Sequence, residues 1–182
     1  MPPTIDTDRL RLRALEPTDA APMYQLIRER AIAATTATIP HPYTPQMAAD
    51  FIAARIAPDA EAMVVAWAVA RRTDARFLGV ISLTLEPELE SAEVGYWIGV
   101  PYWGQGYATE ACTAIVGHGF KELSLARIHG NHLVRNGASG LVLERSGMRH
   151  EGILRRAFRK WGELEDLSYH SILREEWSAT QG

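Results

Sequence analysis

The stretch Tyr102-Trp103-Gly104-Gln105-Gly106-Tyr107-Ala108-Thr109-Glu110 decides the fold, because its glycines interrupt the passage from a predicted strand into a predicted helix. The start of a helix exposes several unpaired N–H groups at the positive end of the helix dipole. Residues without a Cβ atom also let an anion approach the backbone closely. The stretch therefore predicts a loop that wraps a phosphate, and a pyrophosphate would suit it.

The segments on either side support this prediction. Val94–Val100 is rich in aromatic and β-branched residues, which is typical of a buried strand, and Pro101 ends it. After the loop, small or apolar residues recur at helical spacing, which predicts an amphipathic helix from Tyr107 to about Leu123. Its apolar stripe consists of Ala108, Ala111, Cys112, Ile115 and Gly119.

Two familiar phosphate loops do not match this stretch. The Walker pattern needs a Gly-Lys-Ser/Thr ending, and no Lys or Arg lies between Trp103 and Lys121. The dinucleotide fingerprint needs a third glycine and an acidic partner near the end of a second strand. A nucleotide-phosphate binder is therefore only a weak alternative.

The N-terminal part of the chain predicts a strand followed by two helices. Residues 9–15 alternate charged and apolar side chains, and a helix capped by Thr18 or Asp19 is expected to run to about Arg30. Residues 31–45 contain three prolines and predict a loop, after which Thr44 caps a helix to about Ile56. This loop and second helix could cover a substrate.

The rest of the chain predicts a mixed sheet. Residues 63–70, 76–85 and 91–100 are strand candidates joined by short turns, which favours an antiparallel meander. The strand at 127–134 follows a helix, so we expect it to pair in parallel through a right-handed crossover. A short helix capped by Asn136 ends near Ser146, with Gly147 in the left-handed position; strands at 149–159 and 164–176, joined by a turn at Trp161-Gly162, complete the prediction.

Composition narrows the class of protein. The chain has 182 residues, of which 47% are apolar, so it suits one α/β domain spanning residues 1–182. Its net charge of −3 suggests no general attraction to nucleic acid. No run is long enough to span a bilayer, the N-terminus lacks an apolar signal core, and Cys112 is the only cysteine, so a cytoplasmic protein without membrane contact is expected.

Several motifs together resemble the RimJ/RimL-type branch of the GNAT acetyltransferase superfamily. In the loop, Trp103 takes the Gln/Arg position of that family's Gln/Arg-x-x-Gly-x-Gly/Ala pattern, Gly106 the first glycine and Ala108 the final small residue. The resemblance extends over nearly the whole chain. It includes Thr7-Asp8-Arg9-Leu10-Arg11-Leu12-Arg13, Gly95-Tyr96-Trp97, Asn136-Gly137-Ala138-Ser139, Glu144-Arg145-Ser146-Gly147-Met148 and Asp166 to Trp177.

The resemblance implies a fold, a cosubstrate and a reaction. The fold is a single GNAT domain with a mixed, mostly antiparallel sheet of about seven strands and about four helices. The cosubstrate is acetyl-CoA, and the reaction is acetyl transfer to a primary amine by direct attack in a ternary complex. The cofactor-binding residues implied are Trp97, Ile98, Trp103, Gly104, Gln105, Gly106, Tyr107, Ala108, Thr109 and Asn136. For Asn136, helix capping is an alternative role that can coexist.

The candidate catalytic residues are Glu93 and Ser139. An amine with a pKa of roughly 10.4 must lose a proton before it attacks, and strand alternation puts Glu93 on the face of Gly95 and Trp97, where its carboxylate could take that proton. The resemblance implies the same role, although an exposed strand-end carboxylate is the alternative.

The usual tyrosine acid of the family falls at Leu143, so the acid is missing from its usual place. The RimJ/RimL-type pattern offers the Ser139 hydroxyl as a substitute near the coenzyme sulfur. An ordinary serine in the first turn of a helix is the alternative explanation for Ser139, and Tyr169 is a weaker alternative acid.

No metal site is expected. His129 and His132 lie an odd number of residues apart on one strand and so point to opposite faces. Cys112 lies on the apolar stripe of its helix, which favours a buried hydrophobic role over that of an acyl carrier. Arg9, Arg11 and Arg13 share one face of the first strand and are explained by a solvated or salt-bridged edge.

The sequence does not identify the acceptor amine. Protein N-terminal α-amines are one substrate class, and small amines and antibiotics are others. A non-catalytic acyl-CoA-binding or sensing module is the rival from a different class, because the usual tyrosine is missing. A homodimer is expected only by analogy with relatives.

Overall fold

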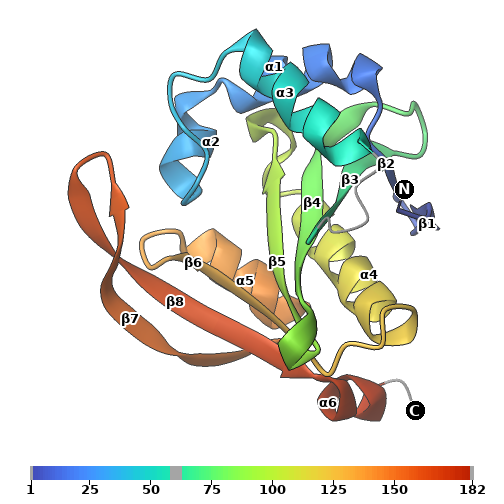
Figure 1. Cartoon of the computed structure of the whole chain (residues 1–182), viewed down its shortest axis with the longest axis vertical. Helices are drawn as coiled ribbons and strands as arrows, with labels where there is room; N and C mark the ends of the chain where they lie inside the picture. Colours follow the sequence, from blue (N-terminus) through green and yellow to red (C-terminus); the bar gives the residue numbers. More distant parts are fainter. Residues whose placement is uncertain (1, 58–62, 181–182) are drawn as a thin grey trace.

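The computed structural model describes residues 2–57 and 63–180, and its centre is one eight-stranded sheet in the order β1-β2-β3-β4-β5-β6-β8-β7 (Figure 1). The strands are β1 Ile5–Asp6, β2 Leu10–Ala14, β3 Val64–Arg71, β4 Phe77–Glu86, β5 Ser91–Ile98, β6 Arg127–Leu133, β7 Arg149–Lys160 and β8 Glu163–Leu173. The α-helices of the described residues are α1 Ala20–Ile27, α2 Arg30–Thr35, α3 Pro45–Ile56, α4 Tyr107–Lys121, α5 Gly137–Arg145 and α6 Arg174–Ala179.

The predicted meander and its crossover are confirmed. Strands β2 to β5 pair with their neighbours in antiparallel register, and β6, reached through α4, pairs with β5 in parallel. The sheet is therefore mixed and mostly antiparallel, as expected. It has one strand more than the sequence predicts, because the two-residue β1 pairs with β2 at the edge.

The parallel pair β5–β6 is short, and this shortness creates the site. Its register covers only Ser91 with Arg127, Ala92 with Ile128 and Glu93 with His129. Beyond these pairs β5 and β6 diverge, and β6 leans toward β8 (Figure 1). The second half of β5 therefore has an edge that no strand covers.

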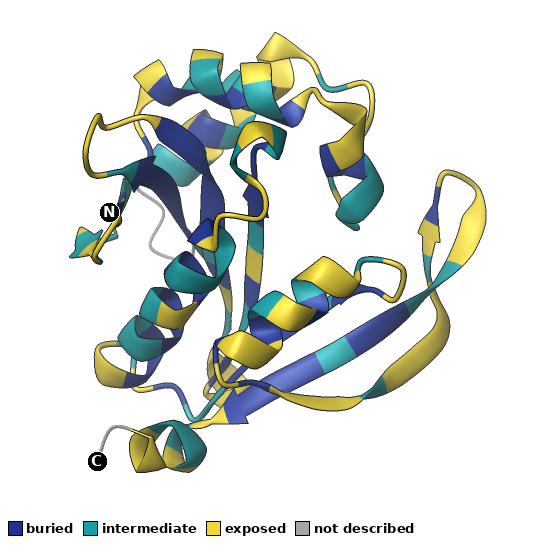
Figure 2. Cartoon of the chain, turned by 180° about the vertical axis from the view of Figure 1, so that it is seen from behind, coloured by how far each residue is buried: buried dark blue, intermediate teal, exposed yellow. Residues whose placement is uncertain are grey.

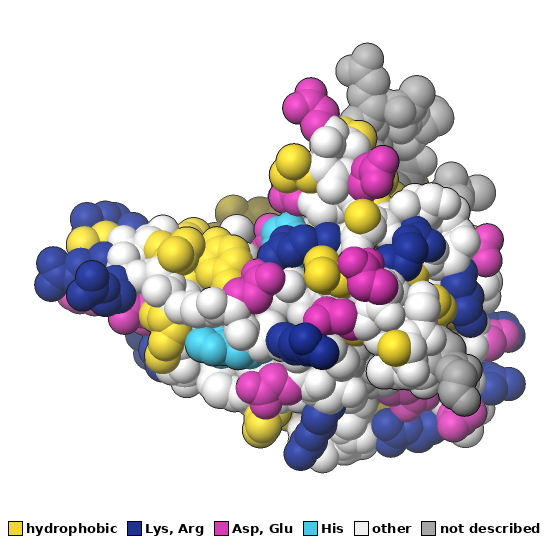
Figure 3. All heavy atoms as spheres, turned by 90° about the horizontal axis from the view of Figure 1, so that it is seen from below, with side chains coloured by type: hydrophobic (Ala, Val, Ile, Leu, Met, Phe, Trp, Pro, Cys, Tyr) yellow, Lys and Arg dark blue, Asp and Glu magenta, His cyan; other side chains and the backbone are white. Residues whose placement is uncertain are grey.

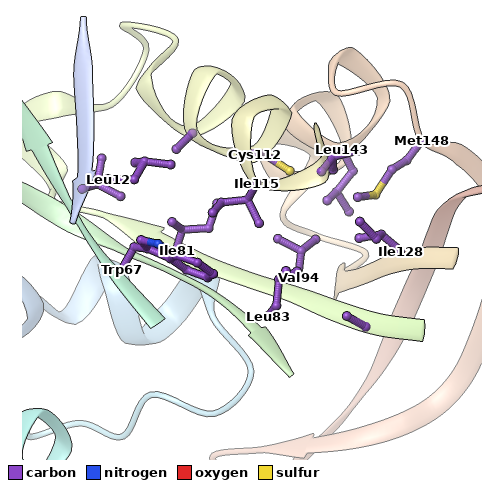
Figure 4. Close-up of a cluster of buried hydrophobic side chains, with 14 of the residues drawn as sticks. Leu12, Trp67, Ile81, Leu83, Val94, Cys112, Ile115, Ile128, Leu143 and Met148 are labelled. Carbon is purple, nitrogen blue, oxygen red and sulfur yellow. The ribbon is translucent and has the colours of Figure 1, made fainter. Parts of the chain in front are cut away.

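The two faces of the sheet carry separate cores. On one face α4 and α5 pack on the sheet, with Trp67, Ile81, Val94, Cys112 and Leu143 among the side chains of that cluster (Figure 4). On the other face α1, α2 and α3 pack around a second cluster that contains Met23, Ile52, Val80 and Trp97. Figure 2 shows the sides of α4 and α5 that face the sheet as buried, the outer side of α5 as largely exposed and the outer side of α4 as mostly intermediate.

Two predicted elements are wrong in part. The first helix ends at Ile27 because Glu29 takes an extended backbone (ψ 125°), and a separate helix, α2, then occupies the beginning of the predicted 31–45 loop. The last strand ends at Leu173, and the following residues form α6, in which Glu176 accepts a hydrogen bond from the Leu173 N–H. These two helices raise the number from the expected four to six among the described residues.

Of the predicted helix caps, two are confirmed and one is wrong. Thr44 caps α3 by accepting from the Met47 N–H, and Asn136 caps α5 by accepting from the Ser139 N–H, both as predicted. The cap at Thr18 or Asp19 is wrong, because the buried Asp19 carboxylate accepts instead from the Glu16 N–H and from Arg13. Asp19 therefore ties the start of α1 to β2.

Strands β7 and β8 extend beyond the rest of the sheet as a hairpin arm, which ends at the predicted Trp161-Gly162 turn (Figure 1). Seen from below, acidic and basic side chains are interspersed over the body, and basic side chains gather at the end of the arm (Figure 3). No helix in the described part of the chain is long and apolar enough to cross a membrane.

Candidate active site

The glycine loop has the backbone that the sequence predicts. Gly104 (φ +72°) and Gly106 (φ +80°) both adopt the left-handed conformation that favours glycine, and Gly106 is the N-cap of α4. A Cβ atom at Gly104 would meet nothing within 4 Å, so this part of the loop is open. The first amide of the helix to bond backward is that of Glu110, to Gly106 O at 3.0 Å, which leaves the three preceding amides of α4 without an intrahelical partner.

The loop is fixed in place by the first turn of the chain. Arg9 donates from Nε to Glu110 at 2.6 Å and from Nη1 to Gln105 O at 2.9 Å, and its guanidinium lies over the Tyr107 ring. Thr7 donates to the same carboxylate. Burial acts to raise the pKa of Glu110, but these hydrogen bonds outweigh it and lower that pKa, so the carboxylate stays charged and keeps its hold on Arg9.

The three arginines at positions 9, 11 and 13 are all ion-paired, as predicted. Besides the Arg9 pair, Arg11 pairs with Asp6 and Arg13 with Asp19. These ion pairs account for the three arginines, so no bound ligand is needed to explain them.

A cavity of about 360 Å³ opens beside the loop and is called here the loop cavity. It brings together nine of the ten predicted cofactor-binding residues: Trp97, Ile98, Trp103, Gly104, Gly106, Tyr107, Ala108, Thr109 and Asn136. The tenth, Gln105, is not among the lining residues, because its side chain turns back to donate to Pro101 O.

The uncovered edge of β5 forms one side of the loop cavity. The Gly99 N–H bonds to Leu78 O on β4, so alternation along the antiparallel pair turns the backbone groups of Tyr96 and Ile98 to the opposite, uncovered edge. One of these groups is used internally, since Trp103 Nε1 donates to Ile98 O at 2.6 Å. That bond fixes the half-exposed indole at the mouth of the cavity.

Several residues of this cavity were not predicted from the sequence. Ile32, Thr35 and Thr36 belong to α2 and its C-terminal end, in a stretch predicted as loop, and nothing in the sequence pattern linked them to the glycine loop. Arg145, near the end of α5, is the only Lys or Arg among the described residues that line the cavity. Its position in the Glu144-Arg145-Ser146-Gly147 segment could have suggested it.

A second cavity of about 340 Å³ lies on the other face of β5 and is called here the carboxylate cavity. Glu93 lines it, together with Gly95 and Trp97 from the same strand, as the alternation predicts. Asn131 of β6 donates from Nδ2 to Glu93 Oε1 at 2.7 Å. The carboxylate is thus oriented by one amide and is half-buried between the diverging strands.

The two cavities meet along a shared wall, which consists of the five residues that line both: Thr35, Thr36, Tyr96, Trp97 and Ser139. Asn136 holds this wall together, since its Nδ2 donates to Thr35 O at 2.8 Å and to Ser139 Oγ at 3.0 Å. Because Ser139 Oγ accepts in that bond, its hydroxyl hydrogen stays available to another acceptor.

Tyr96 adds a second hydroxyl to the shared wall. Its hydroxyl donates to Ser139 O at 3.2 Å. Burial raises the pKa of Tyr96 far above its usual range, so the phenol keeps its proton at any physiological pH. Tyr96 therefore keeps its hydrogen in the bond to Ser139 O and is a poor source of a proton.

Side-chain donors hold the backbone of the segment 34–39, which borders both cavities. Arg135 donates to Ala34 O at 2.6 Å, and Lys160 from the hairpin arm donates to Ala37 O at 2.9 Å and to Ile39 O at 2.8 Å. Burial, followed by the charge of Arg135, lowers the pKa of Lys160. The arm and the β6–α5 turn thus fix a segment that is more than 90 residues earlier in the chain.

The remaining candidates lie away from the shared wall. Leu143 is fully buried in the core, and Tyr169 lines neither cavity. Cys112 is fully buried, and burial raises the pKa of its thiol to about 11. His129 bonds to Glu86, whereas His132 packs against His170, so His129 and His132 point apart. The described residues contain no cluster of His, Cys, Asp and Glu suited to a metal.

Sequence comparison places the chain in a family. The model of the "Acetyltransferase (GNAT) domain" matches residues 9–149, which is most of the chain, so this protein belongs to the GNAT acetyltransferase family. The RimJ/RimL-type resemblance is confirmed by the relatives whose sequences this chain matches.

Two curated relatives carry names that refer to ribosomal proteins. YdaF of Bacillus subtilis (strain 168), named as a candidate ribosomal N-acetyltransferase, is 38% identical over 105 residues, 57% of each chain. The ribosomal-protein-serine acetyltransferase of Escherichia coli (strain K12) is 36% identical over 81 residues, 44% of this chain and 45% of that one. The chain thus spans about half the length of these relatives.

Solved structures share the fold over nearly the whole chain. An acetyltransferase of the GNAT family from Bacillus anthracis superposes with a TM-score of 0.84 at 25% identity, covering 95% of this chain and 99% of that one. The Microcin C7 self immunity acetyltransferase MccE, solved in complex with acetyl-CoA and AMP, superposes with a TM-score of 0.82 at 20% identity, covering 92% and 93%. The second likeness shows the fold alone.

Proposed function

We propose that this protein is an acetyl-CoA-dependent N-acetyltransferase that transfers an acetyl group to a primary amine by direct attack in a ternary complex. One observation carries the proposal: a phosphate-type glycine loop and a lone carboxylate line two cavities that share a single wall. An acyl donor held in the loop cavity and an amine held in the carboxylate cavity would meet at Tyr96, Trp97 and Ser139. Direct transfer requires such a meeting point.

The loop cavity suits the donor. The free amides at the start of α4 would hold the pyrophosphate, and the open space at Gly104 leaves room for it. Arg145 would add a positive charge, and the uncovered edge of β5 offers backbone groups to an extended arm that carries amides, as an added strand would. MccE, a protein of the same fold, is named as a complex with acetyl-CoA, which supports this choice.

Glu93 is proposed as the base. When bound, the thioester supplies an activated acetyl group, and the amine must be neutral to attack it. The Glu93 carboxylate, held by Asn131, is the only carboxylate among the described residues that line the carboxylate cavity, so it is the group placed to take the amine proton, directly or through water.

Fixed donors of the shared wall would stabilise the charge that develops. The Ile98 N–H, turned toward the uncovered edge, is suited to the carbonyl oxygen. The hydroxyl of Ser139 is suited to the departing thiolate, because its hydrogen is not used in the bond from Asn136. A thiol has a pKa near 8.5, well below that of the buried Tyr96, so Tyr96 would not protonate the thiolate, and its one hydroxyl hydrogen bonds to Ser139 O.

The names of the relatives favour a protein N-terminal α-amine as one acceptor, and a small amine or an antibiotic is the other. A non-catalytic acyl-CoA sensor is the second candidate function, favoured by the buried Leu143 in the usual place of the acid. It would bind acetyl-CoA and release no CoA with any amine.

A CoA-release assay tests these functions. Peptides with varied N-termini, polyamines and aminoglycosides would be offered with acetyl-CoA, and binding would be followed separately by the rise in melting temperature. Turnover with any amine supports the enzyme. Binding without turnover supports the sensor, and no binding overturns both.

A further inference from the structure

We infer that the acceptor is a monocation whose amine lies beside an apolar substituent, and that this site excludes polyamines and aminoglycosides. The inference rests on the proposed transfer and names the substrate class of the carboxylate cavity. It is carried by the distribution of charge and apolar surface in that cavity.

The carboxylates of the cavity limit the number of positive charges that it can accept. Of its described lining residues, Glu93 alone carries a carboxylate, and one of its oxygens is already bound by Asn131. An ammonium that enters a partly buried site needs a counter-charge to offset its desolvation. The cavity can offset one such charge, and a second ammonium on the same molecule would have no carboxylate partner there.

The apolar wall of the carboxylate cavity consists of seven side chains from the 36–43 segment, α1, α3 and β4. Six of the seven belong to the second core cluster or pack against it. These lining residues are Met23, Ile27, Ile39, Pro40, Tyr43, Phe51 and Val80. Contact with this wall favours an apolar substituent next to the amine, because it removes that substituent from water.

Two basic side chains lie behind this wall. Lys160 and Arg135 both donate to carbonyls of the 34–39 segment. Arg135 is ion-paired with Glu165 at 2.8 Å, which offsets its charge, so Lys160 supplies the positive charge that stands close to the cavity. Like charges at short range repel across a medium of low dielectric constant. A second ammonium that approached Lys160 would be repelled, which makes polyamines still less favourable.

The size of the carboxylate cavity limits the acceptor further. The volume of about 340 Å³ lies at the low end of the roughly 300–1,000 Å³ of ligand sites. Four hydrogen bonds hold the backbone of the 34–39 segment, so the wall is formed in advance. The cavity therefore suits one amine and one modest apolar group and is too small for an aminoglycoside.

The test uses a matched pair of acceptors with the full chain. Hexylamine and hexamethylenediamine have the same carbon skeleton and differ only in the second ammonium. We expect kcat/KM in the CoA-release assay to be at least about tenfold higher for hexylamine, a ratio equivalent to about 1.4 kcal/mol. Peptides that begin with leucine are likewise expected to exceed peptides that begin with glycine.

A variant sharpens the test. Thr38→Asp adds a carboxylate to the wall of the cavity and is expected to reduce the preference for the monoamine about tenfold. Thr18→Asp, an exposed change outside both cavities, is the control and is expected to leave the preference unchanged.

The outcomes separate the inference from the proposed function. Equal or better turnover of the diamine by the unmodified protein overturns the inference and leaves the transferase intact. Binding of acetyl-CoA, shown by a raised melting temperature, without turnover of these two amines or of any peptide, polyamine or aminoglycoside overturns the transferase and the inference with it. The unmodified protein decides both questions even where Thr38→Asp fails to fold.

Discussion

The loop of the loop cavity comes from a single stretch of chain, residues 102–110. The wall of the carboxylate cavity, in contrast, comes from α1, α3, the 36–43 segment and three strands. The first cavity uses backbone amides and left-handed glycines. The second depends on side chains that meet only after folding. A loop that binds a donor through its backbone can be formed by one short stretch of sequence. The selection of one acceptor, in contrast, needs a surface formed by many helices and strands.

Glu93→Gln is the change with the largest expected effect, and it would act on the carboxylate cavity alone. Without the base, kcat should fall by about 100-fold or more, while the Kd for acetyl-CoA stays the same. The measurement is single-turnover transfer across pH, beside calorimetric binding. Glu88→Gln, an exposed carboxylate outside both cavities, is the control. Full kcat at every pH in Glu93→Gln would remove this residue from the mechanism.

Gly106→Ala would act on the loop cavity. A Cβ atom in the left-handed conformation costs roughly 1–2 kcal/mol and would lie 3.3 Å from Arg9 Nη2, so the loop would be strained and the Arg9 side chain would have to shift. The Kd for acetyl-CoA should rise about tenfold, and the KM for the amine should not change. Gly137→Ala, where a Cβ meets nothing within 4 Å, is the matched control. An unchanged Kd for the coenzyme would contradict the role of the loop.

Lys160→Met would test the attachment of the hairpin arm to the carboxylate cavity. The variant loses two hydrogen bonds to the 34–39 segment, each from a charged donor and worth roughly 1.5–3 kcal/mol when intact. Part of this loss should appear as an increase of about fivefold in the KM for the amine, with little change in kcat. Lys121→Met, at the far end of α4, serves as the control. A loss confined to the melting temperature would make Lys160 purely structural.

Cys112→Ala should have the smallest effect on activity. The thiol is fully buried, and burial raises its pKa to about 11, so almost no thiolate exists at neutral pH. Transfer should continue at the same rate, with a loss of about 1 kcal/mol in the free energy of unfolding. An acetyl group found on Cys112 by mass spectrometry would instead show a covalent intermediate.

The same contrast explains what could be predicted from the sequence. The β-meander, the parallel crossover, the glycine loop and the Asn136 cap follow from local patterns and are confirmed. In contrast, α2 was predicted as loop because the prolines near 40–45 dominate that stretch. The α6 region was predicted as strand because residues 166–177 resemble the closing strand of the family.

The unpredicted parts of the site are contacts over long sequence separations. Asn131 reaches Glu93 across 38 residues, and Lys160 reaches Ala37 across 123. No periodicity in the chain encodes such pairs, because they depend on how far β6 and the hairpin arm extend from the sheet. Arg145 is an intermediate case, since its motif was recognised but its position beside the cavity was not.

The three register pairs between β5 and β6 have a further consequence for the mechanics of the molecule. Strands β1 to β5 and strands β6 to β8 form two parts of the sheet that are joined by only three register pairs, and α4 connects them along the chain. A ligand that lies between the diverging ends of β5 and β6 contacts both parts and links them. Ligand binding should therefore slow amide exchange in both parts together and make their unfolding more cooperative.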